Sequence, residues 1–242
     1  MSYGAGTRAQ SGAVDAGLRA HMLKVYNYMT MALVITGAVA WYAFRAAVDP
    51  SSPTGLSEFG MTIYASPLAW VLMLSPLVFV LILSFGIHKL SMLNAQILFW
   101  AFASVMGLSL SSIFLVYTGE SIARVFFITA ATFGGMSLYG YTTKRDLSGW
   151  GSFLFMGLIG VVIASLVNLF VGSSMMQFVI SVIGVIVFTG LTAYDTQNIK
   201  EMYFAGDGNE VAGKKAIMGA LRLYLDFINL FIMLMHLLGE RR

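Results

Sequence analysis

Residues 147–194 read LSGWGSFLFMGLIGVVIASLVNLFVGSSMMQFVISVIGVIVFTGLTAY, a run of 48 positions that contains no Asp, Glu, Lys or Arg. A helix that crosses a bilayer needs about 20 mostly apolar residues, so this run is long enough for two such helices. The segment Val171-Gly172-Ser173-Ser174 lies near its middle, and small residues of this kind favour a turn. The run therefore predicts two membrane-spanning helices joined by a tight turn.

The rest of the chain shows the same pattern of neutral runs between charged side chains. Four further runs without charge supply one span each: residues 25–44, 59–88, 90–119 and 125–143. The neutral run after Asp226 covers only residues 227–239, so the last span must begin near Ala216 and include Arg222 and Asp226. Seven spans are predicted, at about 25–46, 67–88, 92–117, 122–142, 151–171, 176–199 and 216–238.

The composition of the whole chain supports an all-α integral membrane protein. Only 10% of its 242 residues are charged and 58% are hydrophobic, whereas a soluble domain carries about 25% charged residues. The net charge of +3 gives no reason to expect a nucleic-acid partner, and the absence of cysteine excludes disulfides and thiolate sites. We expect a disordered, Gly-, Ala- and Ser-rich tail at 1–23, followed by one transmembrane domain at 24–242.

The distribution of Lys and Arg predicts how the chain is oriented. Nine of these residues lie in the N-terminal tail and in the connections after spans two, four and six, and four lie on the opposite side. Because Lys and Arg concentrate on the cytoplasmic side, we expect the N-terminus in the cytoplasm. Short loops and a simple tail favour a multi-pass protein of a bacterial cytoplasmic membrane.

Two aspartates lie at membrane depth on the last two predicted spans. Asp195 lies about 7–8 Å from the cytoplasmic end of span six, and Asp226 lies roughly 16 Å deep in span seven, at 1.5 Å per residue. A carboxylate at this depth is costly and usually faces a partner or a water-filled cavity. If the two meet, they would share a proton, and the ionised pair would attract Ca²⁺. Alternatively, Asp195 caps a helix end and Asp226 pairs locally with Arg222.

These residues lie in segments that resemble a known family. Ala-Tyr-Asp-Thr-Gln at 193–197 and Leu-Tyr-Leu-Asp-Phe-Ile-Asn-Leu-Phe at 223–231 are similar to the signature segments of the Bax inhibitor-1 family, also called the transmembrane Bax inhibitor motif family. The resemblance in span number and spacing covers about residues 20–238. It implies a bacterial-type member in which the last of seven helices is central and the other six wrap around it.

The resemblance also implies a function. Family members are associated with a pH-regulated Ca²⁺ leak, gated by a pair of aspartates on the last two helices. By position these correspond to Asp195 and Asp226, which we expect to bind calcium and a proton. Four neighbouring residues are expected to gate or support the pair: Arg222, Tyr194, Tyr224 and Asn229.

One feature of the sequence departs from the family pattern. A bacterial branch has an arginine on the second helix that contacts the aspartate pair in the closed state. Here residues 67–87 contain neither Arg nor Lys, and the nearest candidates are His88 and Lys89 at the cytoplasmic end. Arg222, one turn before Asp226, is the alternative closing group.

Two other classes of function are kept open. Some relatives in the family restrain a membrane-bound ATP-dependent protease or oppose cell death, which would make this chain an interaction protein. Intramembrane aspartyl proteases also pair two aspartates, but they carry a Gly-x-Gly-Asp segment where this chain has Leu223-Tyr224-Leu225-Asp226. The segment at 208–215 mimics a phosphate-binding loop, but Lys215 replaces the required Ser or Thr. We therefore expect no enzymatic activity, no cofactor and no nucleotide, with the lipid bilayer and Ca²⁺ as the main partners.

Overall fold

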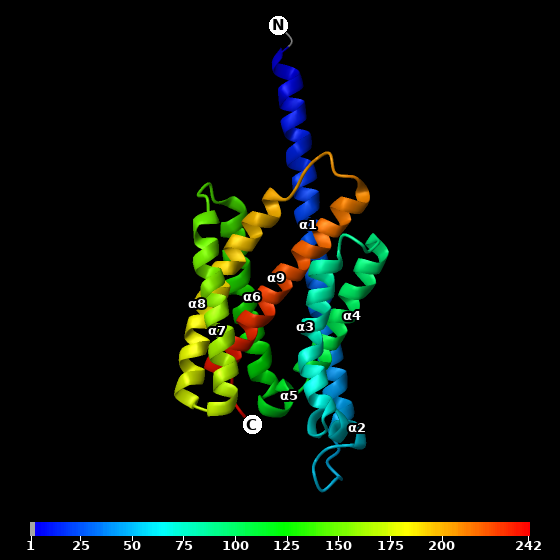
Figure 1. The fold of residues 1–242 in the computed structure, drawn as a ribbon, viewed down its shortest axis with the longest axis vertical. Helices are drawn as coiled ribbons and strands as arrows, with labels where there is room; N and C mark the ends of the chain where they lie inside the picture. Colours follow the sequence, from blue (N-terminus) through cyan, green and yellow to red (C-terminus); the bar gives the residue numbers. More distant parts are fainter. Residues whose placement is uncertain (1–2) are drawn as a thin grey trace. The chain divides into compact units, whose positions relative to one another are not determined.

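The computed structural model describes the backbone of residues 3–242 and the side chains of residues 16–242. Within this range the regular elements are helical, and two isolated bridges join Val48 to Leu56 and Tyr117 to Arg241. The elements are α1 (Tyr3–Ala47), α2 (Glu58–Gly60), the π-helix η1 (Met61–Ala65), α3 (Leu68–Gly86), α4 (Met92–Leu110), α5 (Ile113–Val116), α6 (Gly119–Thr142), α7 (Ser148–Val171), α8 (Ser174–Glu201) and α9 (Asn209–Leu238) (Figure 1).

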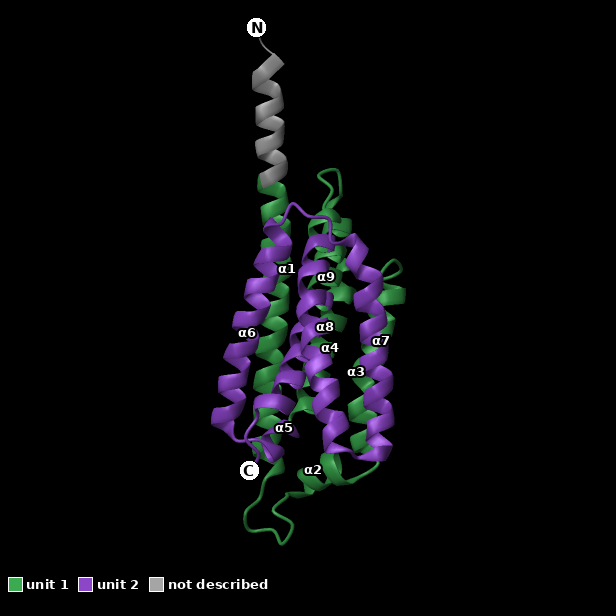
Figure 2. Ribbon diagram, turned by 90° about the vertical axis from the view of Figure 1, so that its left-hand side faces the viewer, with its two compact units in different colours: residues 1–111, 199–221 green, residues 112–198, 222–242 purple. Residues whose placement is uncertain are grey.

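The chain divides into two compact units, and the division falls within α9. Unit 1 comprises residues 1–111 and 199–221, and unit 2 comprises residues 112–198 and 222–242 (Figure 2). Whether residues 24–242 behave as one domain therefore stays a prediction. The most apolar stretch of α9 is 72% buried, compared with 11–39% for the other described spans. The arrangement of six helices around α9 also stays a prediction.

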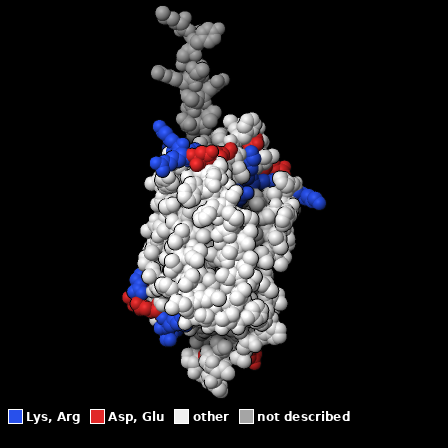
Figure 3. Space-filling view, turned by 60° about the vertical axis from the view of Figure 1, so that its left-hand side comes forward, with Lys and Arg blue, Asp and Glu red and all other residues white. Residues whose placement is uncertain are grey.

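Seven described helices are long and apolar enough to cross a membrane, which confirms the predicted all-α membrane class. The spans at Leu68–Gly86, Met92–Val116, Gly119–Thr142, Ser148–Val171 and Ser174–Glu201 begin and end within three residues of the predicted bounds. In Figure 3, Lys, Arg, Asp and Glu gather toward the helix ends, and a broad band between them is uncharged. This is the distribution expected of helices surrounded by lipid.

The first and last helices begin earlier than predicted. Residues 16–23 belong to α1, although we expected the whole tail to lack order. His21 and Met22 are buried there, and the His21 ring lies 5.8 Å from the ring of Tyr203, so packing within unit 1 accounts for the order. Met1 and Ser2, the first residues of the predicted tail, lie outside the described residues.

α9 begins at Asn209 rather than near Ala216 because its first turns carry favourable charges. Glu210 lies in the first turn, where the partial positive charge of a helix N-terminus favours an anion. Its carboxylate also lies 2.8 Å from the ammonium of Lys214, a pair spaced four residues apart along the helix. These polar turns extend the helix beyond its apolar span.

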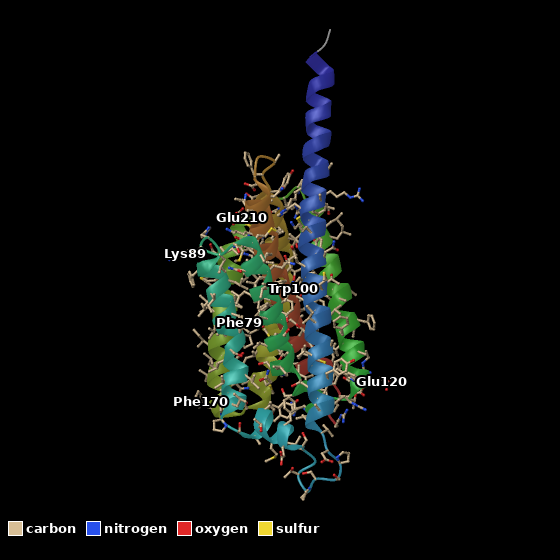
Figure 4. The ribbon with its side chains drawn as sticks, turned by 90° about the vertical axis from the view of Figure 1, so that its right-hand side faces the viewer. Phe79, Lys89, Trp100, Glu120, Phe170 and Glu210 are labelled. Carbon is tan, nitrogen blue, oxygen red and sulfur yellow. The ribbon has the colours of Figure 1, made fainter. Side chains whose placement is uncertain are left out.

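Unit 1 is built from α1, α3 and α4 with the first part of α9. The Thr36 hydroxyl of α1 donates to the Ala103 carbonyl of α4 at 2.8 Å, which ties these two helices together. Phe79 of α3 and Trp100 of α4 lie midway along the helices, and Lys89 and Glu210 lie at one end of the unit (Figure 4). The loops after α3 and before α9 are thus at the same end, as the span order predicts.

Unit 2 contains α6, α7, α8 and the last part of α9. The predicted turn between α7 and α8 is present: Gly172 adopts a left-handed φ of 65°, and the Ser173 amide donates to the side-chain oxygen of Asn168 at 3.0 Å. Near the start of α6 and the end of α7, Glu120 and Phe170 lie toward the same end of the unit (Figure 4). α6 and α8 approach closely at Gly140, which is buried against Ala193.

Candidate functional site

α8 and α9 bring Asp195 and Asp226 together within unit 2. The two carboxyl groups interact directly with each other. Asp226 is only 5% exposed, and the Asp195 side chain is 16% exposed. The aspartates therefore lie together, largely away from bulk water.

The direct interaction of the two carboxyl groups has a chemical consequence. An ionised carboxylate can only accept hydrogen bonds. Two carboxyl groups can therefore form a hydrogen bond with each other only when one of them holds a proton. The other Asp226 oxygen, Oδ2, is buried and has no hydrogen-bond partner among the described residues. A buried polar atom of this kind is costly to leave unpaired, so the site suits a proton, a water molecule or a cation.

Arg222 supplies the nearest positive charge in unit 2. Its Nη1 atom lies 3.9 Å from Oδ1 of Asp195, and its side chain is 45% exposed. The ion pair thus joins α9 to α8 instead of closing locally onto Asp226 within α9. At this distance and exposure it is a weak, screened interaction. His88 and Lys89, the other candidates for the closing group, belong to unit 1.

A cavity of about 490 Å³ opens beside the pair, between α7, α8 and α9. Tyr194, Asp195, Arg222 and Asp226 line it, and so does Asn229. The Asn229 side-chain nitrogen donates to the Leu225 carbonyl at 2.8 Å, and the amide oxygen is a further possible ligand atom. The cavity is partly open and largely apolar, and the aspartates, Arg222 and Asn229 give it the polar groups that an ion or water would contact.

Two of the predicted supporting residues differ in placement. Tyr194 lines the cavity, and its ring occupies the space beside Gly151, where an added Cβ would come within 2.5 Å of the ring. Tyr224 is fully buried. It lies two residues before Asp226, which at 3.6 residues per turn puts it on the opposite side of α9. Tyr224 is thus a packing residue in this structure and does not line the cavity.

Sequence reasoning missed the polar residues that hold α8 in place. Gln197 accepts from the Leu147 amide at 2.8 Å and donates to the Arg145 carbonyl at 2.9 Å, which fixes the loop between α6 and α7 onto α8. The Thr196 hydroxyl lies 3.0 Å from that of Ser137 on α6. Asn198 hydrogen-bonds to Asp195. The sequence signal was their position: Thr196, Gln197 and Asn198 directly follow Asp195.

The geometry offers little for a permanently bound metal. Among the described residues there is no group of three or more His, Cys, Asp or Glu that could hold one. Ca²⁺ takes six to eight oxygen ligands, whereas the cavity offers two carboxyl groups and one amide oxygen. An ion at this site would keep several water ligands and would be held loosely.

Comparison with known proteins identifies the family. The family model described as Inhibitor of apoptosis-promoting Bax1 matches residues 18–242. The chain belongs to the Bax inhibitor family. It is 48% identical to the Inner membrane protein YbhL of Escherichia coli strain K12 over 229 residues, which cover 94% of each chain.

Other relatives of this Bax inhibitor family protein are also bacterial. A protein of Rickettsia prowazekii is 48% identical over 236 residues, covering 98% of this chain and 96% of the relative. A membrane protein of Streptococcus pyogenes is 38% identical over 229 residues, covering 93% and 95%. The names of the E. coli and S. pyogenes relatives and the seven apolar helices agree on a multi-pass membrane protein.

Proposed function

We propose that this Bax inhibitor family protein is a passive, pH-regulated Ca²⁺ leak channel of the bacterial cytoplasmic membrane. The observation that supports the proposal is the direct contact between the Asp195 and Asp226 carboxyl groups at a cavity among membrane-spanning helices. Charged residues inside a membrane are costly and usually mark an ion or proton path.

The protonation state of the pair is the proposed control. With both carboxyl groups ionised, the pair presents two hard anionic ligands that favour Ca²⁺. With one proton shared between them, the negative charge is halved and the Ca²⁺ site weakens. Acidification therefore reduces Ca²⁺ occupancy, and a loosely held, partly hydrated ion can leave the site, as conduction requires.

Arg222 is proposed as a competitor for the same site. Its guanidinium faces the Asp195 carboxylate at 3.9 Å and lines the same cavity. A cation that binds between the aspartates displaces this weak ion pair. Arg222 thus takes the place of the second-helix arginine that this chain lacks.

The proposed orientation places the N-terminus in the cytoplasm, since nine Lys and Arg residues lie on that side against four on the other. A reporter inserted between residues 202 and 208, before α9, is expected to be cytoplasmic. The same reporter inserted at residues 50–56, between α1 and α2, is expected to be external. Two reporters on the same side would remove the seven-span model, and a swap of the two sides would reverse the orientation.

The function itself is tested by Ca²⁺ flux into proteoliposomes that contain the purified protein and a Ca²⁺ dye. We expect a passive flux that falls as the pH is lowered and that vesicles without protein do not show. A matched sample of protein that was unfolded by heat before reconstitution controls for Ca²⁺ leakage that any added protein would cause. A flux equal to that of protein-free vesicles at every pH would contradict the channel and favour an interaction protein.

A further inference from the structure

A second cavity in unit 2, of about 330 Å³, lies between α6, α7 and α8. Its mouth is the loop between α6 and α7, where Arg145 and Asp146 line it. Its walls are largely apolar and include the rings of Tyr139, Trp150 and Phe153. The groove thus leads from two opposite charges into an apolar slot.

Hydrogen bonds hold the Asp146 carboxylate and the backbone of Arg145 at the mouth. The Arg145 carbonyl accepts from Gln197 of α8 at 2.9 Å, so the loop cannot swing away from α8 freely. Asp146 accepts from the Ser148 amide at the start of α7 at 2.8 Å. Hydrogen bonding to Ser148 lowers the pKa of the Asp146 carboxyl, so this group is ionised at neutral pH. The mouth therefore presents the Asp146 carboxylate, which Ser148 holds, beside the exposed side chain of Arg145, whose backbone is tied to α8.

The walls are exposed aromatic rings at the end of a span. Trp150 is 60% exposed and Phe153 is 63% exposed, and their rings meet edge to face at 6.3 Å. Trp is enriched at the boundary between lipid and water, which is where the first turn of α7 lies. Ile186 of α8 lines the groove eight residues before Tyr194, so the groove follows α8 for about 12 Å toward the centre of the membrane at 1.5 Å per residue.

We propose that this groove binds one phospholipid with a zwitterionic amine headgroup, of the phosphatidylethanolamine type. The lipid phosphate pairs with Arg145, the primary ammonium donates to Asp146 and faces the Trp150 ring, and one acyl chain lies along the apolar walls. A purely anionic headgroup would meet the Asp146 carboxylate, and a choline headgroup has no N–H to donate to it. Free phosphate would leave the apolar walls unused. The site does not depend on whether the protein conducts Ca²⁺.

Trp150 provides its own reporter for the test. The variant W41F/W70F/W100F keeps Trp150 as its single tryptophan, and it is reconstituted in phosphatidylcholine vesicles that contain increasing amounts of brominated phosphatidylethanolamine, phosphatidylcholine or phosphatidylglycerol. Bromine quenches tryptophan fluorescence at contact, so the quenching curve gives the relative affinity of the groove for each lipid. We expect the ethanolamine lipid to bind about three- to tenfold more tightly than the choline lipid. This is the difference in affinity that one hydrogen bond to a charged or polar group contributes.

Changes at the mouth separate a built site from ordinary contact with the bilayer. Asp146→Asn in the single-tryptophan protein should abolish the preference for ethanolamine, and Arg145→Gln should weaken binding of every phospholipid. Lys144→Gln, a neighbouring loop residue that does not line the groove, should change neither. A W41F/W100F/W150F variant, which keeps Trp70 of unit 1, reports the bulk lipid. Equal quenching of Trp150 by the three lipids, or preferential quenching by the anionic lipid, would overturn the proposal.

Discussion

Replacing Asp226 with Asn is expected to abolish the pH dependence of Ca²⁺ flux across proteoliposomes. Asn has the shape of a neutral carboxyl group but cannot gain or lose a proton near neutral pH, so the pair loses its titratable step. Because Asp226 is buried and bonded to Asp195, one substitution should be enough to remove the shared proton. The measurement is the flux rate over a pH series for the wild type and the variant at equal protein density.

The partner substitution and a matched control complete the test. Asp195→Asn should give the same flat pH profile, since the proton belongs to the pair and not to either residue. Asp49→Asn removes a carboxylate from the exposed loop after α1 and should leave the profile unchanged. If the Asp195→Asn, Asp226→Asn double variant kept the pH-dependent flux of the wild type, the pair would have only a structural role. That result would favour the hypothesis that the chain is an interaction protein.

Arg222→Gln removes the positive charge next to the aspartate pair and tests its effect on the same site. Arg222 faces Asp195 and favours its ionised form, so its loss should move the midpoint of the pH profile to higher pH. The shift should stay below about one pH unit, because exposed ion pairs contribute about 0.2–1 kcal/mol and one unit corresponds to about 1.36 kcal/mol. An unchanged midpoint would mean that Arg222 does not act on the pair.

The spans and the aspartate pair could be predicted because both follow from the cost of charge in lipid. A run of 20 uncharged residues marks a span, and a lone carboxylate within a span needs a partner. The turn at Gly172 could also be predicted, because small residues interrupt a long apolar run there. These features depend on local sequence and on the high cost of placing a charge in lipid.

The contacts that position the pair could not be predicted, because they depend on which helix faces meet. Arg222 is four residues from Asp226 and far from Asp195 in sequence, and only the packing of α8 against α9 shows that it pairs with Asp195. Tyr194 precedes Asp195 by one residue and Tyr224 precedes Asp226 by two, and the first lines the cavity whereas the second is buried in packing. His21, in the predicted tail, lies against Tyr203, which is distant in sequence.

Substituting Gly140 with Ala is expected to destabilise the protein far more than the same change elsewhere in α6. A Cβ atom at this position would lie 2.2 Å from the Ala193 carbonyl oxygen, which is backbone and cannot rotate away. α6 and α8 would have to separate, and overpacking of this kind costs about 1–3 kcal/mol or more. We expect thermal unfolding in detergent to occur roughly 5–10 °C lower, given about 2–4 °C per kcal/mol for a chain of this size.

The same helix offers a matched control at Gly134, where an added Cβ would meet nothing within 4 Å. Gly134→Ala should be neutral or slightly stabilising, because Ala is favoured over Gly in a helix by about 1 kcal/mol. Ala193 immediately precedes Tyr194 and Asp195, so moving α8 away from α6 also moves one half of the aspartate pair. Gly140→Ala should therefore alter the pH profile of Ca²⁺ flux in the protein that remains folded, whereas Gly134→Ala should not. Equal melting temperatures for the two variants would show that α6 and α8 do not approach at Gly140 as closely as the structure has them.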